Sequence, residues 1–173
     1  MKNIFVLSAL GFSCGLPYML VFSTLSAWLR DAGAALTVIG FISWAALTYS
    51  LKFLWSPFVD RIKMPLNQVV GQRRSWILMM QLLILILIMM MSQFDPISSL
   101  NFIVITAVLI AFFGSLQDIA VDAYRIELVS LDEQGNLAAS YQFGYRLSIL
   151  VATSLALIFA CLLYTSPSPR DVP

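Results

Sequence analysis

The residues of this chain that could do chemistry lie inside apolar segments. The apolar run that begins at Leu100 ends in the stretch GSLQDIAVDAYRIE, which contains Asp118, Asp122 and Arg125. At about 100° of rotation per residue, these three side chains project from one face of a helix, whereas Glu127 points away and lies nearer the helix end. A charge inside a membrane is costly and usually marks a proton relay, a solute path or an ion pair between helices.

Two further charges are predicted at the depth of the aspartates. With a rise of about 1.5 Å per residue, Asp118 lies about 15 Å inside its apolar segment, Lys52 about 12 Å and Arg146 about 13 Å. We therefore expect these groups to share one layer. Gln117 and Tyr145 adjoin these charges in the sequence. All of these residues together form the predicted substrate or proton pathway.

A purely structural interpretation of the same charges stays open. The long side chains of Lys52 and Arg125 could extend to the lipid headgroups. A pair between an aspartate and an arginine could also serve only to lock two helices together.

The composition excludes a soluble domain. The 173 residues are 60% hydrophobic and only 11% charged, with a mean hydropathy of +0.89, whereas soluble domains are typically about 25% charged. The chain has no histidine, which removes histidine proton shuttles and most zinc sites, and its two cysteines lie within apolar runs. The sequence thus predicts an all-α, multi-pass membrane protein with no cofactor, no metal and no nucleic-acid partner.

Five apolar segments are long enough to cross a lipid bilayer, which takes about 20 helical residues. They are residues 4–29, 37–59, 76–93, 100–128 and 137–163. One side of the membrane would hold Lys2, Arg61, Lys63, Arg73 and Arg74, and the other only Arg30. Because cytoplasmic loops are rich in lysine and arginine, we expect the N-terminus to be cytoplasmic.

The loop after the second segment contains a known type of signature. It reads SPFVDRIKMPLNQVVGQRRSW and resembles the Gly-x-x-x-Asp-Arg-x-Gly-Arg-Arg motif of major facilitator transporters. Asp60 and Arg61 match, Ser56 replaces the first glycine, and the Gly-x-Arg-Arg part arrives eight residues late. The resemblance implies a cytoplasmic gate of Asp60, Arg61, Gly71, Arg73 and Arg74. A role for these residues as topology anchors only stays open.

Longer stretches of the sequence resemble one particular family of transporters. GFSCGLPYMLVFSTLSAWLRDAG, SLKFLWSPFVDR, GQRRSW, DIAVDAYRIE and GYR are similar to the AmpG-type muropeptide permeases, and the related acetyl-CoA transporters share parts of this pattern. The similarity covers about Gly11 to Leu150. It implies a proton-linked permease in the bacterial inner membrane that imports anhydro-muropeptides for cell-wall recycling. Its partners would be that solute or a similar small one, protons and the lipid bilayer.

The family resemblance implies twelve or more helices in two halves, whereas five segments are found here. We therefore expect residues 1–163 to be most of an N-terminal half, which would not transport without the C-terminal half. The last residues change abruptly to LLYTSPSPRDVP, which resembles translated adapter sequence. We expect residues 164–173 to be non-native, with a periplasmic loop as the alternative, and give no functional weight to residues after about Cys161.

Rival functions fit parts of the same pattern. Gly114, Asp118 and Asp122 match the second half of the metal motif of CDP-alcohol phosphatidyltransferases, but the four positions of its first half do not match. An intramembrane aspartyl protease needs aspartates on two facing helices, and here both lie on one. The remaining alternatives are another major-facilitator or acetyl-CoA-transporter-like carrier, and a membrane assembly protein with an Asp–Arg lock.

Overall fold

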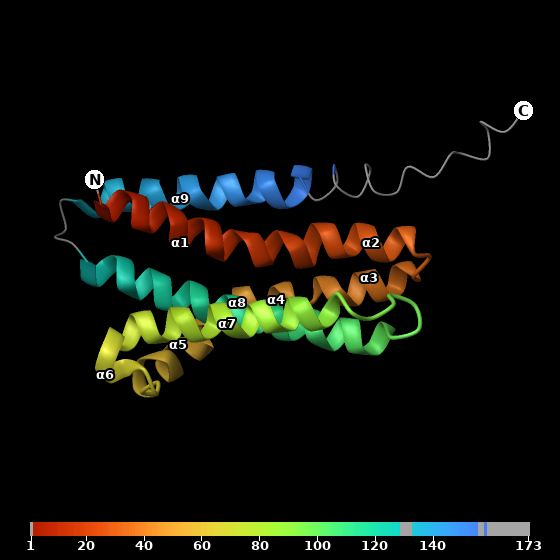
Figure 1. Cartoon of the computed structure of the whole chain (residues 1–173), viewed down its shortest axis with the longest axis horizontal. Coiled ribbons are helices and arrows are strands. Elements are labelled where there is room, and N and C mark those ends of the chain that lie inside the picture. The colour runs from red at the N-terminus through yellow and green to blue at the C-terminus, as the bar shows by residue number, and fades with distance from the viewer. Residues whose placement is uncertain (1, 129–132, 156–157, 159–173) are drawn as a thin grey trace, which may run out of the picture.

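The computed structural model describes residues 2–128, 133–155 and 158, and every regular element within these residues is a helix (Figure 1). The chain is therefore an all-α bundle over the part that the structure describes. The elements, in order, are α1 (Lys2–Met19), η1 (Leu20–Thr24), α2 (Leu25–Asp31), α3 (Leu36–Ser43), α4 (Ala46–Ser50), α5 (Lys52–Arg61), α6 (Asn67–Val70), α7 (Gln72–Met91), α8 (Leu100–Leu128), α9 (Gln134–Leu150) and η3 (Val151–Leu155).

Three continuous helical stretches are long and apolar enough to cross a membrane. They are Asn3–Asp31, Gln72–Met91 and Leu100–Leu128. The first of them contains Pro17 and widens into the π-helix η1 at Leu20. The segment expected at 137–163 begins as α9 and η3, and its remaining residues, like the tail 164–173, lie outside the described residues.

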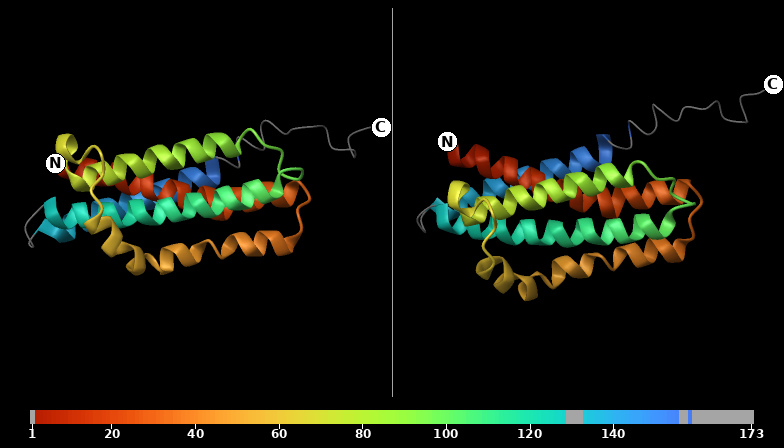
Figure 2. Two further views of the ribbon diagram at one scale, coloured as in Figure 1. Left: turned by 90° about the horizontal axis from the view of Figure 1, so that it is seen from below. Right: turned by 60° about the horizontal axis from the view of Figure 1, so that its bottom comes forward.

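The segment expected as one helix at 37–59 is instead broken. Leu36–Ser50 and Lys52–Arg61 meet at an angle of 53° and together qualify as a fourth span. Leu51 lies at the break with φ −92° and ψ 14°, outside the helical range. The bend of this segment is visible in both views of Figure 2. It places Lys52 at the start of a new helix, where its side chain is directed toward α8.

Helix α8 is the centre of the bundle. It packs against α1, α4, α5, α7 and α9, and residues such as Ile103, Ala107 and Ala120 are fully buried on it. Small residues permit this close packing within a membrane. The charged end of α8 is consequently enclosed by several helices.

Helices α1 and α9 run side by side along their length (Figure 1). A Cβ atom at Gly11 would collide with the backbone oxygen of Tyr141, and one at Gly144 with the backbone oxygen of Ser8. The Ser8 hydroxyl also donates to the Ser140 carbonyl at 3.0 Å. This close approach holds α9, and with it Tyr141, in place beside α8.

Candidate functional site

A lysine joins the two interior aspartates. Lys52 Nζ lies 3.0 Å from Asp118 Oδ2 and 3.2 Å from Asp122 Oδ2. The two carboxylates are one helical turn apart on α8, so one ammonium group reaches both of them. The break before α5 is what brings Lys52 to this position.

Each aspartate also has a second partner, and the two partners differ. The Tyr141 hydroxyl on α9 donates to Asp118 Oδ1 at 2.6 Å, whereas Arg125 Nη2 lies 3.5 Å from Asp122 Oδ1. The Arg125 guanidinium also lies 5.7 Å from the centre of the Tyr141 ring. Lys52, Asp118, Asp122, Arg125 and Tyr141 thus form one connected set from three helices, which we call the interior cluster.

The interior cluster opens onto a pocket of about 310 Å³ that Gln142 and Tyr145 also line. The side chain of Asp118 is 18% exposed and that of Asp122 is 34% exposed. A solute or water molecule in this pocket could therefore reach both carboxylates and both cations. The arrangement can hold a proton on a carboxylate, or can present a cation to an anionic group of a solute.

Two of the predicted pathway residues lie elsewhere. Arg146 is exposed and forms no ion pair with any carboxylate of the described residues. Gln117 is fully buried, and its amide donates to Ser13 Oγ on α1 at 3.1 Å. Ser13 accepts a second hydrogen bond from Gln81 on α7 at 2.9 Å. Gln117 therefore connects α8 with α1 and α7 and does not line the pocket.

Sequence reasoning missed Tyr141, Ser13 and Gln81. Tyr141 precedes the predicted residue Tyr145 by four positions on the same helix, a spacing that puts two side chains on one face. That spacing could have revealed Tyr141. No pattern in the sequence indicates that Ser13 would accept from two glutamines, because this depends on how three helices pack.

A second charged group occupies the end of the bundle where α5, α7 and α8 meet. Arg73 Nη1 lies 2.5 Å from Asp60 Oδ1, and Arg73 Nε lies 3.0 Å from Glu127 Oε1. The Gln72 amide donates to the Asp60 carbonyl at 2.8 Å. We call Asp60, Gln72, Arg73 and Glu127 the rim network. It ties the start of α7 to the end of α5 and to the end of α8.

The other residues predicted for the gate surround this rim network. Arg74 donates to the Tyr124 hydroxyl at 3.2 Å and also lies over its ring. Gly71 has a φ of +90° at the start of α7, a conformation that favours glycine. Arg61 is exposed at the end of α5. Among the described residues, no group of three or more His, Cys, Asp or Glu side chains could hold a metal ion.

The helices and the interior cluster define a multi-pass membrane protein with charged groups inside its membrane-spanning part. A family model described as "Acetyl-coenzyme A transporter 1" matches residues 3–99, which is more than half of the 173 residues. The chain therefore belongs to this family of transporters.

Individual relatives match a longer part of the chain. The anhydromuropeptide permease of Escherichia coli K12 is 41% identical over 155 residues, which are 90% of this chain and 31% of the permease. A protein of Rickettsia felis that carries the name AmpG 4 is 37% identical over 158 residues, which are 91% of this chain and 38% of that protein. The chain thus resembles the AmpG-type permeases and spans roughly a third of the length of these relatives.

Proposed function

We propose that this chain is part of a proton-coupled permease of the bacterial inner membrane that imports anhydro-muropeptides or similar small solutes. The observation that carries the proposal is Lys52 bridging Asp118 and Asp122 inside the apolar bundle. The name of the Escherichia coli relative supports the class of solute. In this proposal the chain forms the first five helices of a major-facilitator N-terminal half, with its N-terminus in the cytoplasm.

The proposed coupling uses the interior cluster. When Asp118 or Asp122 accepts a proton, that carboxyl group becomes neutral and its ion pair with Lys52 is lost. Lys52 or Arg125 can then pair with a carboxylate of the solute in the adjoining pocket. Release of the proton restores the ion pair and displaces the solute. Protonation and solute binding are thereby linked through one shared cation.

Transport also requires a second half. Alternating access takes two halves that rock around a site near the middle of the membrane, so the C-terminal half of the longer protein is the necessary partner. We further propose that Asp60, Arg61, Gly71, Arg73 and Arg74 belong to a cytoplasmic gate. The two ion pairs of Arg73 support this, because they join the start of α7 to α5 and to α8.

A carrier for acetyl-CoA or a related anion is the second candidate, and the description of the matching family model favours it. Both candidates are carriers, so no catalytic residue, cofactor or metal is assigned. A structural role for the interior cluster as an Asp–Arg helix lock is the alternative from another class. The contact between Arg125 and Asp122, at 3.5 Å on one helix, does not join two helices and so argues against that lock.

Uptake by the longer reading frame in proteoliposomes tests this proposal. We expect a labelled anhydro-muropeptide to accumulate when the outside is acidic, and to stop accumulating when a protonophore removes the gradient. Acetyl-CoA should not compete at equal concentration. Competition by acetyl-CoA together with no muropeptide uptake would favour the second candidate, and a lack of uptake of both solutes would overturn the proposal.

A further inference from the structure

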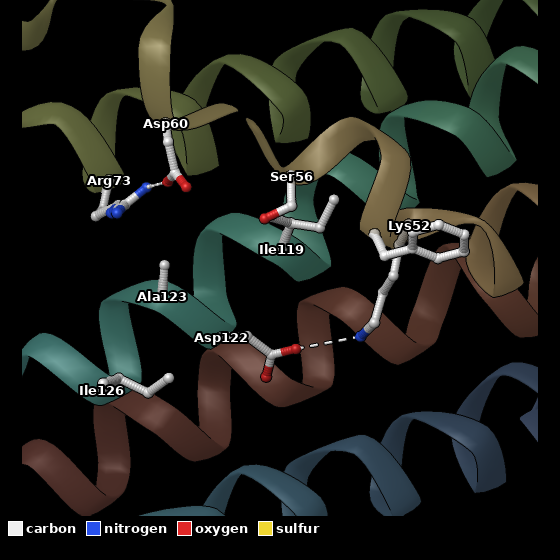
Figure 3. Close-up of a pocket in the computed structure, with 9 residues that line it drawn as sticks. Lys52, Ser56, Asp60, Arg73, Ile119, Asp122, Ala123 and Ile126 are labelled. Carbon is white, nitrogen blue, oxygen red and sulfur yellow. Dashed lines mark hydrogen bonds and ion pairs between the residues drawn. The ribbon is translucent and has the colours of Figure 1, made fainter. Parts of the chain in front are cut away.

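A second pocket adjoins the interior cluster on the side away from α9. It has a volume of about 340 Å³, and Figure 3 shows the residues around it. The lining residues are Lys52, Phe53, Ser56, Asp60, Arg73, Ile119, Asp122, Ala123 and Ile126. We call this pocket the vestibule. It lies between α5 and α8 and was not indicated by the sequence.

The vestibule extends from the interior cluster to the rim network. The ion pair of Lys52 with Asp122 lies at one end, and that of Arg73 with Asp60 lies at the other (Figure 3). Lys52 and Asp60 are eight residues apart on α5, which corresponds to about 12 Å along the helix axis. The pocket therefore links a charged site within the span to the end of the bundle.

The region between these two ion pairs is open because small side chains line it. Ser56 and Ala123 face the middle of the pocket from α5 and α8, with Ile119 beside them (Figure 3). Ser56 is the position at which the facilitator signature has glycine. The Ser56 hydroxyl thus adds a polar group halfway along a passage whose other polar groups lie at its ends.

The described residues leave the charged groups that line this pocket partly uncovered. The side chain of Lys52 is 41% exposed and that of Asp122 is 34% exposed. Charged atoms within a membrane span face water or another polar group, because contact with hydrocarbon is strongly unfavourable. At about 340 Å³, the pocket is many times larger than the roughly 10–15 Å³ that one water molecule needs. Lys52, Asp122, Ser56 and Asp60 supply the polar partners for such water.

We propose that the vestibule is a water-filled passage through which Asp122 exchanges protons with the cytoplasm. This inference rests on the proposed function and on the proposed orientation. The O–H bond of the protonated Asp122 carboxyl breaks, the proton passes to water as hydronium, and the carboxylate returns to its ion pair with Lys52. The hydronium charge then moves past Ser56 to the rim network and into bulk water. The solute uses the separate pocket that Tyr141 and Tyr145 line.

Thiol accessibility tests this passage without any transport assay. Ser56→Cys and Ala123→Cys are made in the longer reading frame after replacement of Cys14 and Cys161. Ala120→Cys on the same helix is the matched control, because Ala120 is fully buried. A membrane-impermeant cationic methanethiosulfonate is applied to inside-out and right-side-out vesicles. We expect both vestibule thiols to react at least tenfold faster than the control, and only from the cytoplasmic side.

A substitution that fills the vestibule provides a second test of the passage. Ala123→Phe should lower the reaction rate of Ser56→Cys at least fivefold, whereas Ala123→Ser, which keeps the space, should leave it unchanged. Vestibule thiols that react no faster than Ala120→Cys would overturn the passage, as would equal reaction from both sides. If proton-driven uptake persists while these thiols stay unreactive, only the proposed passage is contradicted. If the thiols react but no solute is taken up, only the proposed function fails.

Discussion

Replacement of Lys52 by methionine is expected to abolish proton-driven uptake by the longer protein and to destabilise this chain. Among the described residues, Lys52 is the single cation that contacts both Asp118 and Asp122, and methionine keeps the apolar stem without the charge. Removal of one partner from a buried ion pair costs about 3–5 kcal/mol. Because Lys52 is 41% exposed and exposed ion pairs contribute only about 0–1 kcal/mol, we expect a loss between these limits, about 2 kcal/mol, which corresponds to a factor of roughly 30 in the folding equilibrium. Protein abundance and thermal stability in detergent measure the loss.

Two further variants separate the effect of charge from that of packing. Lys52→Arg keeps the cation and should retain most of the stability, with reduced uptake because the guanidinium is larger and planar. Lys52→Met combined with Asp118→Asn removes one charge of each sign and leaves Asp122 with Arg125. That double variant should recover stability but not uptake. Full uptake in Lys52→Met alone would show that the interior cluster has no part in coupling.

The second large effect is expected at the contact of α1 with α9. In Gly144→Ala, the new methyl group would overlap the backbone oxygen of Ser8, and a backbone atom within a packed helix cannot move aside cheaply. Overpacking typically costs 1–3 kcal/mol, and we expect about 3 kcal/mol here because the obstacle is backbone. The separation of α9 from α1 would also draw the Tyr141 hydroxyl away from Asp118.

Gly40→Ala is the matched control for this substitution. Gly40 lies in α3, and a Cβ atom added there would have no neighbouring atom of the described residues within 4 Å. The added methyl group therefore meets open space, and alanine is favoured over glycine within a helix by about 1 kcal/mol. We expect Gly40→Ala to unfold at or above the temperature of the unaltered chain and Gly144→Ala well below it. Equal thermal stability of the two variants would contradict the close packing of α1 and α9.

Much of the interior cluster can be predicted from the sequence by counting residues along the helices. The helical periodicity puts Asp118, Asp122 and Arg125 on one face of α8, and counting from the helix ends puts Lys52 at a matching depth. Both expectations agree with the ion pairs that Lys52 forms. They could be made in advance because charges within an apolar span are few, and each must find a partner or water.

Depth alone does not decide which side chains meet. The same count puts Arg146 in this layer, but Arg146 is exposed and forms no ion pair with a carboxylate of the described residues, because α9 turns Tyr141 toward Asp118. The rotation of a helix is set by its packing, here by Gly11 and Gly144. The 53° bend of the second span was likewise missed, since no proline or glycine adjoins Leu51 and Pro57 lies six residues further on.

In the proposed coupling, the carboxylates of the interior cluster carry the proton. Solute accumulation driven by an imposed pH gradient tests this role when it is measured for Asp118→Asn and Asp122→Asn in proteoliposomes of the longer protein at matched protein levels. We expect both variants to lose proton-driven accumulation while they are still made and inserted normally. Accumulation with the pH dependence of the unaltered protein in both variants would contradict the claim, and unchanged uptake with lowered abundance would assign these aspartates to holding the helices together.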